Sequence, residues 1–180
     1  MSEKLNLSPA GDPMIAHSKS IPCPQTASLS HALIVFLTIP GTVSIVIPMI
    51  WLWHTTRLTP FHPLALLCVI PGLSALIWCV HDFYVYGKGT LAPWRPPTVL
   101  VTSGLYRFSR NPMYLSVLLI LIGWTLYSAD RFLIGYTVTA ALLFHLRVVF
   151  GEEPYLARAH GQSWKDYSDR VPRWFCVRSK

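Results

Sequence analysis

The sequence predicts an all-α protein: a polytopic membrane helical bundle of about four transmembrane helices, with a C-terminal helical hairpin and a cytosolic C-terminal helix. Three observations lead to this fold class. Hydrophobic residues make up 52% of the 180 residues and charged residues only 13%, whereas a soluble domain carries roughly 25% charged residues. The apolar residues form long uncharged runs, and the basic residues are unevenly divided between the segments that flank those runs.

The chain begins with a polar segment. Residues 1–30 are rich in Ser and Pro, and no apolar stretch follows a basic start within them. We therefore expect a disordered tail rather than a signal peptide. The remaining residues, 31–180, are expected to form one membrane domain, since their number is that of a single domain.

Four apolar runs are candidates for membrane spans. A helix needs about 20 apolar residues to cross about 30 Å of hydrocarbon, and the runs cover residues 31–53, 62–80, 113–129 and 132–150. Pro40 and Pro48 would kink the first, which membrane helices tolerate. The third run is short for a span. Only Asp130 and Arg131 separate the third run from the fourth, which predicts an antiparallel helical hairpin.

The basic residues indicate which side of the membrane each segment occupies. With four spans, 13 of the 15 Lys and Arg residues fall in the N-terminal tail, the loop at about 82–112 and the C-terminal end, and two fall on the opposite side. The positive-inside rule then places both termini and that loop in the cytosol. We expect an integral protein of a bacterial inner membrane or an endomembrane.

Several site classes find no support in the sequence. The net charge of +7 is compatible with nucleic acid or with an anionic membrane surface, and the uncharged runs favour the membrane over nucleic acid. The four cysteines form no CxxC pair, and His, Cys, Asp and Glu show no metal-ligand spacing. We therefore expect no bound metal. A GxSxG nucleophile motif does not occur either.

Two segments on the predicted cytosolic side carry the polar residues of interest, residues 87–114 and 152–174. The first is rich in Gly and Pro, a composition that exposes backbone N–H groups to a ligand but also suits a loop that only anchors helices. Arg107 and Arg110 in it could contact lipid phosphates or recognise an anionic ligand. Glu152 and Glu153 in the second could form salt bridges with Arg147 or Arg158, or accept hydrogen bonds from a ligand.

The two segments together resemble the isoprenylcysteine carboxyl methyltransferase family, which is related to the phospholipid methyltransferases. The family pattern is Gly-x-Tyr, Arg-His-Pro-x-Tyr, a helical hairpin, Glu-Glu and an ending Phe-Gly-x-x-Tyr-x-x-Tyr-x-x-x-Val-Pro. The matching residues are Gly104, Tyr106, Arg110, Pro112, Tyr114, Glu152, Glu153, Gly161, Tyr167, Val171 and Pro172. Asn111 replaces the family histidine, and Trp164 replaces the first tyrosine of the ending.

The resemblance implies that residues 31–180 are a methyltransferase-like membrane domain that binds S-adenosylmethionine on the cytosolic side and takes its acceptor from the bilayer. Arg110, Arg147 and Glu153 are the expected catalytic residues, with an arginine meeting the methionine or acceptor carboxylate. The expected cofactor-binding residues are Gly104, Tyr106, Asn111, Pro112, Tyr114, Glu152 and Glu153.

Three questions stay open at the level of the sequence. The first is the acceptor, a membrane lipid or a lipidated substrate, for which a prenylcysteine carboxylate, a phospholipid amine and another lipophilic thiol or acid all remain candidates. An NADPH-dependent enzyme resembling the membrane sterol reductases is the alternative enzyme, because those proteins have a related hairpin and a similar Arg-x-Pro-x-Tyr region. A non-catalytic membrane scaffold is the alternative from another class.

Overall fold

The computed structural model describes residues 37–55, 63–86 and 100–175, and every regular element in these ranges is helical. In chain order the elements are η1 (Leu37–Val46), α2 (Ile47–Thr55), α3 (Pro63–Tyr86), η2 (Gly104–Arg107), α4 (Pro112–Ser128), α5 (Arg131–Arg147), η3 (Val148–Glu152) and α6 (Glu153–Arg170). The expected tail at 1–30, the start of the first expected span and residues 87–99 of the cytosolic loop lie outside the described residues.

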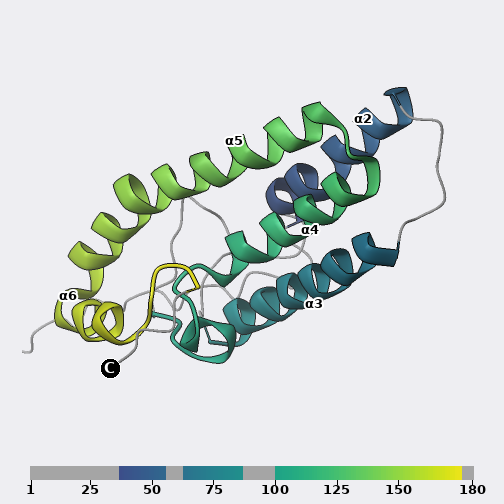
Figure 1. Cartoon of the computed structure of the whole chain (residues 1–180). Helices are drawn as coiled ribbons and strands as arrows, with labels where there is room; N and C mark the ends of the chain where they lie inside the picture. Colours follow the sequence, from purple (N-terminus) through teal and green to yellow (C-terminus); the bar gives the residue numbers. More distant parts are fainter. Residues whose placement is uncertain (1–36, 56–62, 87–99, 176–180) are drawn as a thin grey trace, which may run out of the picture.

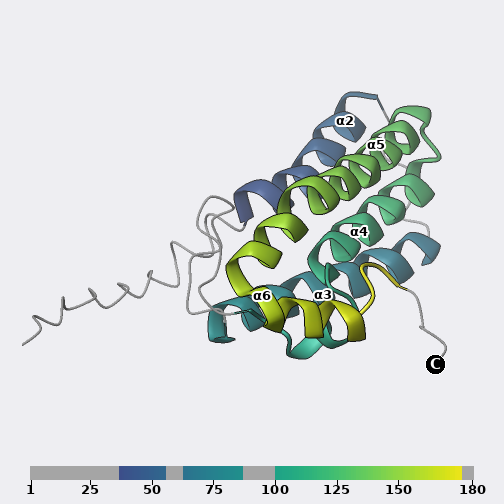
Figure 2. The same cartoon turned by 90° about the vertical axis from the view of Figure 1, so that its left-hand side faces the viewer.

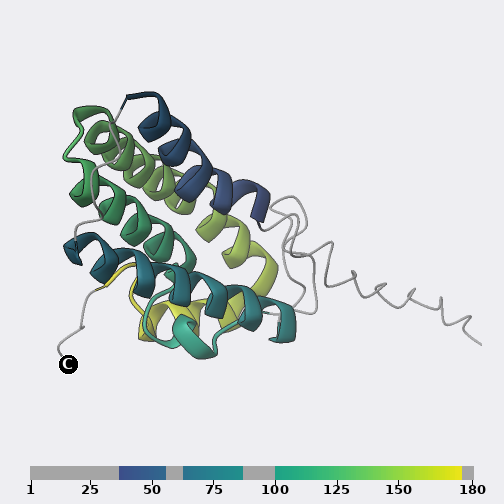
Figure 3. The ribbon, with the colours of Figure 1, turned by 90° about the vertical axis from the view of Figure 1, so that its right-hand side faces the viewer.

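Helix α4 lies at the centre of the bundle. It packs against α3 and α5 and also contacts η1 and α2, and Figures 1 and 3 show these helices running side by side. Its Val117, Ile120 and Leu121 are at most 2% exposed, and they form one apolar core with Leu76 of α3 and Ala140 of α5. The short third run of the sequence therefore supplies much of the buried core of the bundle.

The outer surface of the bundle is apolar. Two helical stretches, Pro63–Asp82 and Arg131–Arg170, are long and apolar enough to cross a membrane, and only 22% and 17% of their most apolar windows are buried. Large side chains such as Leu67, Ile77 and Val138 are 63–70% exposed. A core helix of a soluble protein would bury such residues, whereas a helix that is apolar all round suits a bilayer.

The helices follow the expected apolar runs, with shifts at their ends. Helix α3 extends six residues past the expected Val80, and α4 starts at Pro112, where proline suits the first position of a helix. The larger difference follows α5. The chain remains helical from Arg131 through η3 and into α6 as far as a kink at Gly161, so Glu152 and Glu153 do not face an exposed helix C-terminus and its unfavourable dipole.

The predicted hairpin of α4 and α5 is confirmed. Ala129 adopts a left-handed conformation, with φ of 50°, and ends α4. Asp130 then caps α5: its carboxylate accepts from the backbone N–H groups of Phe132 at 2.8 Å and of Leu133 at 3.3 Å. The indole N–H of Trp51 also donates to Asp130 at 3.2 Å, which joins α2 to this end of the hairpin.

The first described helix starts with π-helical turns that contain Pro40. Trp124 of α4 donates to the carbonyl of Ser44 at 2.9 Å, and Tyr136 of α5 donates to the carbonyl of Val43 at 2.9 Å. Backbone polar groups inside a membrane need partners within the protein. These two aromatic donors therefore attach the irregular helix to the hairpin.

Glycines allow α3 and α4 to approach closely. A Cβ atom on Gly72 of α3 would lie 2.7 Å from the Ile120 side chain and 3.1 Å from the Ser116 carbonyl oxygen, both on α4. A Cβ on Gly123 of α4 would lie 2.5 Å from the Val69 side chain on α3. Small residues at such contacts are the usual means of packing helices within a membrane, because burial of apolar surface from water does not drive the association there.

We predict that Gly72→Ala lowers the free energy of unfolding by about 1–3 kcal/mol, because the added methyl group forces α3 away from α4. Gly135→Ala is the matched control, since a Cβ there meets nothing within 4 Å and alanine favours the helix. Thermal unfolding in detergent measures both variants. Equal stability of the two would contradict the close-packing argument.

Candidate functional site

The polar residues expected to form a site gather at one end of the bundle. At this end α3 stops, η2 leads into α4, and α5 continues into α6, which turns across the bundle as Figures 1 and 2 show. The turn within α6 occurs at Gly161, whose φ of 50° and ψ of −119° are open to glycine but strained for other residues. The second half of α6 thereby brings Trp164 and Tyr167 back against the bundle, where both are buried.

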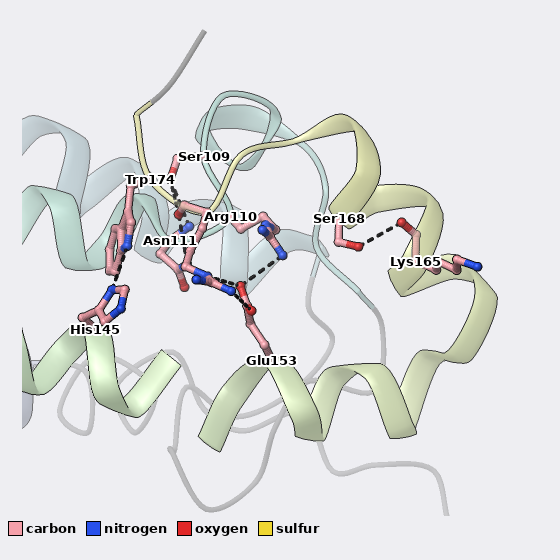
Figure 4. Close-up of polar contacts among 9 residues, drawn as sticks. Ser109, Arg110, Asn111, His145, Glu153, Lys165, Ser168 and Trp174 are labelled. Atoms are coloured by element: carbon pink, nitrogen blue, oxygen red, sulfur yellow. Dashed lines mark hydrogen bonds and ion pairs between the residues drawn. The ribbon is translucent and has the colours of Figure 1, made fainter. Parts of the chain in front are cut away.

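The first cluster is centred on Glu153. Its carboxylate lies 3.0 Å from Nη1 of Arg110 and accepts hydrogen bonds from Nε and Nη2 of Arg173 at 2.8 and 2.6 Å. The side chains of Glu153 and Arg110 are only 15% and 14% exposed. Paired, charge-assisted contacts of this kind hold geometry well, and Figure 4 shows Arg110 and Glu153 meeting from different elements.

Arg110 also faces an aromatic ring. Its guanidinium carbon lies 5.6 Å from the centre of the Trp164 ring, a distance at which a cation is attracted to the π face. Its Nε is buried and has no hydrogen-bond partner within the described part of the chain. Arg110 therefore keeps one donor that a ligand in this cluster could use.

The second cluster is centred on Glu152. Its carboxylate accepts from the hydroxyl of Tyr114 on α4 and from Nε of Arg147 on α5 at 2.9 Å, and the same Nε lies 3.1 Å from the tyrosine oxygen. The Tyr114 ring packs on Phe144 with 4.7 Å between ring centres. Adjacent residues of a helix point about 100° apart, so Glu152 and Glu153 serve two separate clusters.

The chain after α6 returns to the start of α4, and we call residues 171–175 the C-terminal strap. The Pro172 carbonyl accepts from the backbone N–H of Arg110 at 2.9 Å. The Arg173 carbonyl accepts from the Ser109 hydroxyl at 3.2 Å and from the Asn111 amide at 3.1 Å. Figure 4 shows Ser109 and Asn111 beside the Arg110–Glu153 pair, and their bonds to the Arg173 carbonyl place the strap next to the first cluster.

The strap also contacts α5. The Trp174 indole N–H donates to Nδ1 of His145 at 3.3 Å, with the two rings stacked. Sequence reasoning did not anticipate this contact between α5 and the strap. It did not identify Arg173 or Trp174, although both directly follow the Val171-Pro172 pair that carried the resemblance.

Tyr106 and Tyr167 join η2 to α6. Tyr106 is 7% exposed, and its carbonyl accepts from the Tyr167 hydroxyl at 2.8 Å. Burial raises the pKa of Tyr167 to about 12, against the opposing influence of the Arg110 charge. Gly104, at the start of η2, has φ of 58° and faces the carboxylate of Asp82 at the end of α3.

The structure thus divides the predicted site residues among three neighbouring groups. Arg110, Asn111 and Glu153 belong to the first cluster and its strap, and Tyr114, Arg147 and Glu152 form the second. Gly104 and Tyr106 belong to the η2 turn. Pro112 occupies the first position of α4, and its carbonyl accepts from the Ser116 hydroxyl of the same helix at 2.8 Å.

Comparison with known proteins identifies the family. A family model described as "Phospholipid methyltransferase" matches residues 62–163. The chain belongs to the phospholipid methyltransferase family. The resemblance inferred from the sequence is therefore confirmed at the level of this group of methyltransferases.

The family match spans α3, α4, α5 and the two glutamates, whereas the strap lies beyond it. An uncharacterized protein from Haemophilus influenzae is 34% identical over 62 residues, which cover 34% of this chain and 98% of that protein. No solved structure matches the chain significantly. The family membership indicates a methyltransferase that acts on lipids.

We predict that Arg173→Lys releases the strap, because lysine cannot form the paired contacts that the guanidinium makes with Glu153. Hydrogen exchange at residues 171–175 should become at least about tenfold faster, which corresponds to about 1.4 kcal/mol. Arg158→Lys is the control, since the Arg158 side chain donates to the Pro154 carbonyl of its own helix, away from the strap. Unchanged protection of the strap in Arg173→Lys would contradict its anchoring by Glu153.

We predict that Tyr167→Phe lowers the free energy of unfolding at pH 9 but hardly at pH 11.5. The reason is that the wild type itself loses the contribution of the protonated Tyr167 hydroxyl at high pH. The folded-state pKa of about 12 lies above the ordinary value of about 10, so the folded form holds the phenolic proton more tightly. The contribution is complete below about pH 10 and disappears as the pH rises to about 12. Thermal unfolding at pH 9 and pH 11.5 should show the wild type and the variant converging at the higher pH.

Proposed function

We propose that this protein is an integral membrane enzyme that transfers the methyl group of S-adenosylmethionine to a lipophilic acceptor at the cytosolic membrane face. The acceptor is of the prenylcysteine carboxylate or phospholipid amine type. The observation that carries the proposal is the pair of acid–arginine clusters at one end of an otherwise apolar bundle. Charged groups at membrane depth are costly and usually functional.

The proposed topology has four spans, formed by η1 with α2, by α3, by α4 and by α5. The clusters then lie on the cytosolic side, together with both termini. The distribution of 13 basic residues against two supports this orientation. The exposed apolar surface of α3 and α5 supports their contact with lipid.

The first cluster has free capacity for the proposed cofactor. A carboxylate has about four acceptor sites, and Arg110 and Arg173 occupy three of those on Glu153. One acceptor site, on Oε2 of Glu153, remains for a cofactor hydroxyl or amine. The partnerless Nε of Arg110 suits a carboxylate such as that of the methionine moiety. The donor set therefore fits a zwitterionic ligand.

The second cluster supplies further charged and polar side chains for ligand binding beside the first cluster. We propose that Arg147 meets the cofactor or acceptor carboxylate and that Glu152 binds an amine or hydroxyl, with Tyr114 orienting Glu152. Tyr106 and Gly104 would shape the wall of the site at η2. Asn111 would act by holding the strap over the first cluster, since its amide donates to the Arg173 carbonyl.

Methyl transfer of this kind requires little of the protein beyond the positioning of donor and acceptor. S-Adenosylmethionine, when bound, supplies a methyl group on a sulfonium that reacts by in-line displacement. The residues named here would align the two reactants and keep water out, which is a large part of the rate enhancement available to such a reaction. A protein nucleophile is not required.

We predict that Glu153→Gln weakens S-adenosylmethionine binding at least tenfold, because the amide cannot hold both arginines in place and offer the same acceptor site. Isothermal calorimetry on the detergent-solubilised protein measures the affinity, with NADPH titrated in parallel. Asp166→Asn is the matched control, since Asp166 lies on the exposed face of α6 and contacts Gln162.

Each outcome of this titration has a separate meaning. Unchanged affinity in a folded Glu153→Gln variant would remove Glu153 from the cofactor site. Saturable binding of NADPH in place of S-adenosylmethionine would favour the alternative of an enzyme resembling the sterol reductases. Binding of neither by folded wild-type protein would favour a scaffold.

A further inference from the structure

Arg110 is enclosed in the structure, although the proposed site needs it to meet a ligand. Its side chain is 14% exposed, and that of its ion-pair partner Glu153 is 15% exposed. The Nε atom of Arg110 is buried and has no hydrogen-bond partner among the described residues. A ligand carboxylate must come within about 3 Å of this atom to accept its hydrogen. One of the groups packed around Arg110 therefore has to move before such a ligand can bind.

Two segments outside α4 contact Arg110, and the first of them is α6. This helix contributes Glu153 and the ring of Trp164. Its second half is anchored by Trp164 and Tyr167, which are 8% and 4% exposed. An aromatic side chain buries about 150–250 Å², so moving this half of α6 would expose two large rings to water. Helix α6 is therefore a fixed wall of the cluster.

The second segment is the C-terminal strap, which is attached in a different way. None of residues 171–175 is buried, and Phe175 is 75% exposed. The strap is held by polar bonds, such as that of the Pro172 carbonyl with the backbone N–H of Arg110. Bonds that water can replace add little net stability, whereas buried apolar surface adds more. Segments with few buried apolar contacts open most readily, so the strap is the cover that moves at the lowest cost.

One contact holds the strap from outside the first cluster. The Trp174 indole N–H donates to Nδ1 of His145 at 3.3 Å, and the two rings are stacked with 6.2 Å between their centres. Figure 4 shows this pair to one side of the Arg110–Glu153 pair. His145 belongs to α5, so it is a fixed point on a long helix. We call this hydrogen bond the latch of the strap.

Movement of the strap would free two kinds of binding group at once. Arg173 donates to Oε1 and Oε2 of Glu153 at 2.8 and 2.6 Å, so its departure returns acceptor sites to the carboxylate. The Pro172 carbonyl would leave Arg110 in the same movement, since the two residues are adjacent. An acceptor for an amine and a donor for a carboxylate would then face the opening together. This pair suits the two charges of an α-amino acid group.

We propose that the C-terminal strap is a lid over the first cluster, latched by Trp174 on His145, which opens to admit S-adenosylmethionine to Arg110 and Glu153. The lid rests on the proposed function and adds to it the route by which the cofactor enters. In its closed position the strap keeps water away from the charged pair. A lid of this kind also sets how fast the ligand enters and leaves.

The first test needs no ligand. Trp174→Phe and His145→Phe each remove the latch and keep an aromatic ring in the stack. Labelling of Arg110 by p-hydroxyphenylglyoxal, followed by peptide mass spectrometry on the detergent-solubilised protein, measures how often the guanidinium is uncovered. Losing one hydrogen bond raises the open fraction about fivefold. Labelling of Arg110 and hydrogen exchange at residues 171–175 should therefore both become about fivefold faster in each variant.

The double variant tests whether one bond is responsible. Because Trp174→Phe and His145→Phe remove the same hydrogen bond from opposite sides, their effects should not add. The double variant should thus show the same fivefold acceleration as either single variant. A product of about 25-fold would mean that the two residues act separately, and it would exclude the latch.

The second test measures the rate at which S-adenosylmethionine binds, by stopped-flow mixing with the solubilised protein. If the strap has to open first, the association rate constant scales with the open fraction and rises about fivefold in each latch variant. If the strap were only a wall of the site, losing the latch would accelerate dissociation and leave association unchanged. That second result would overturn the lid.

Tyr136→Phe is the matched control. It also removes a single aromatic donor from α5, because the Tyr136 hydroxyl donates to the Val43 carbonyl at 2.9 Å, away from the strap. Labelling of Arg110, exchange of the strap and association of S-adenosylmethionine should all stay at the wild-type rates. Equal acceleration in this control would indicate a general loosening of the bundle and contradict a specific latch.

The remaining outcomes separate the lid from the proposed function. Faster exchange of the strap without faster labelling of Arg110 would show that the strap does not cover the cluster. Unchanged exchange of the strap in the folded latch variants would exclude the latch. If the wild type binds no S-adenosylmethionine, the proposed function fails, whereas the labelling still decides whether the strap covers Arg110.

A further variant serves if the latch variants fail to fold. Arg173→Lys loosens the strap at its contact with Glu153, and the Trp174–His145 bond stays in place. Labelling of Arg110 should become faster in this variant together with exchange of the strap. Wild-type labelling of Arg110 in Arg173→Lys, with a strap that exchanges faster, would overturn the proposal.

Discussion

The double ion pair of Glu153 is the interaction on which the polar end of this protein depends. It joins Arg110 at the entrance to α4 and Arg173 in the C-terminal strap to the first turn of α6. No single helix or sheet contains all three segments, so no continuous series of backbone hydrogen bonds holds them together. Because the carboxylate is largely buried, losing either arginine would leave charge uncompensated in a poorly solvated place. The strap, the start of α4 and the α5–α6 helix are therefore interdependent.

The continuity of α5 and α6 determines where that carboxylate stands. A π-helical turn at Val148–Glu152 carries the chain from one helix to the next without a break, and turns of this kind are frequent at functional sites. Glu152 consequently faces α4 and Arg147, while Glu153 faces the strap. Each of the two adjacent acids therefore serves one cluster, and the helical turn that carries them fixes their separation.

The position of Asn111 illustrates how a departure from the resembled pattern can leave the fold intact. Its amide reaches the Arg173 carbonyl, a contact that needs a hydrogen-bond donor and no charge. Histidine could provide the same donor, but it could also become cationic, which asparagine cannot. The substitution therefore preserves the strap and alters the electrostatics next to Arg110.

The sequence by itself determined the all-helical class with its long apolar helices, the hairpin at Asp130 and the family, because hydrophobic length, charge and local capping are properties of contiguous residues. It also selected Arg110, Glu152 and Glu153 as residues of interest, and left their partners open between Arg147 and Arg158. Only the tertiary structure decided that Arg173 pairs with Glu153 and that the carboxylate of Asp82 packs against Gly104. Those contacts join residues more than 19 positions apart through the packing of several elements, and no local pattern in the chain encodes such proximity.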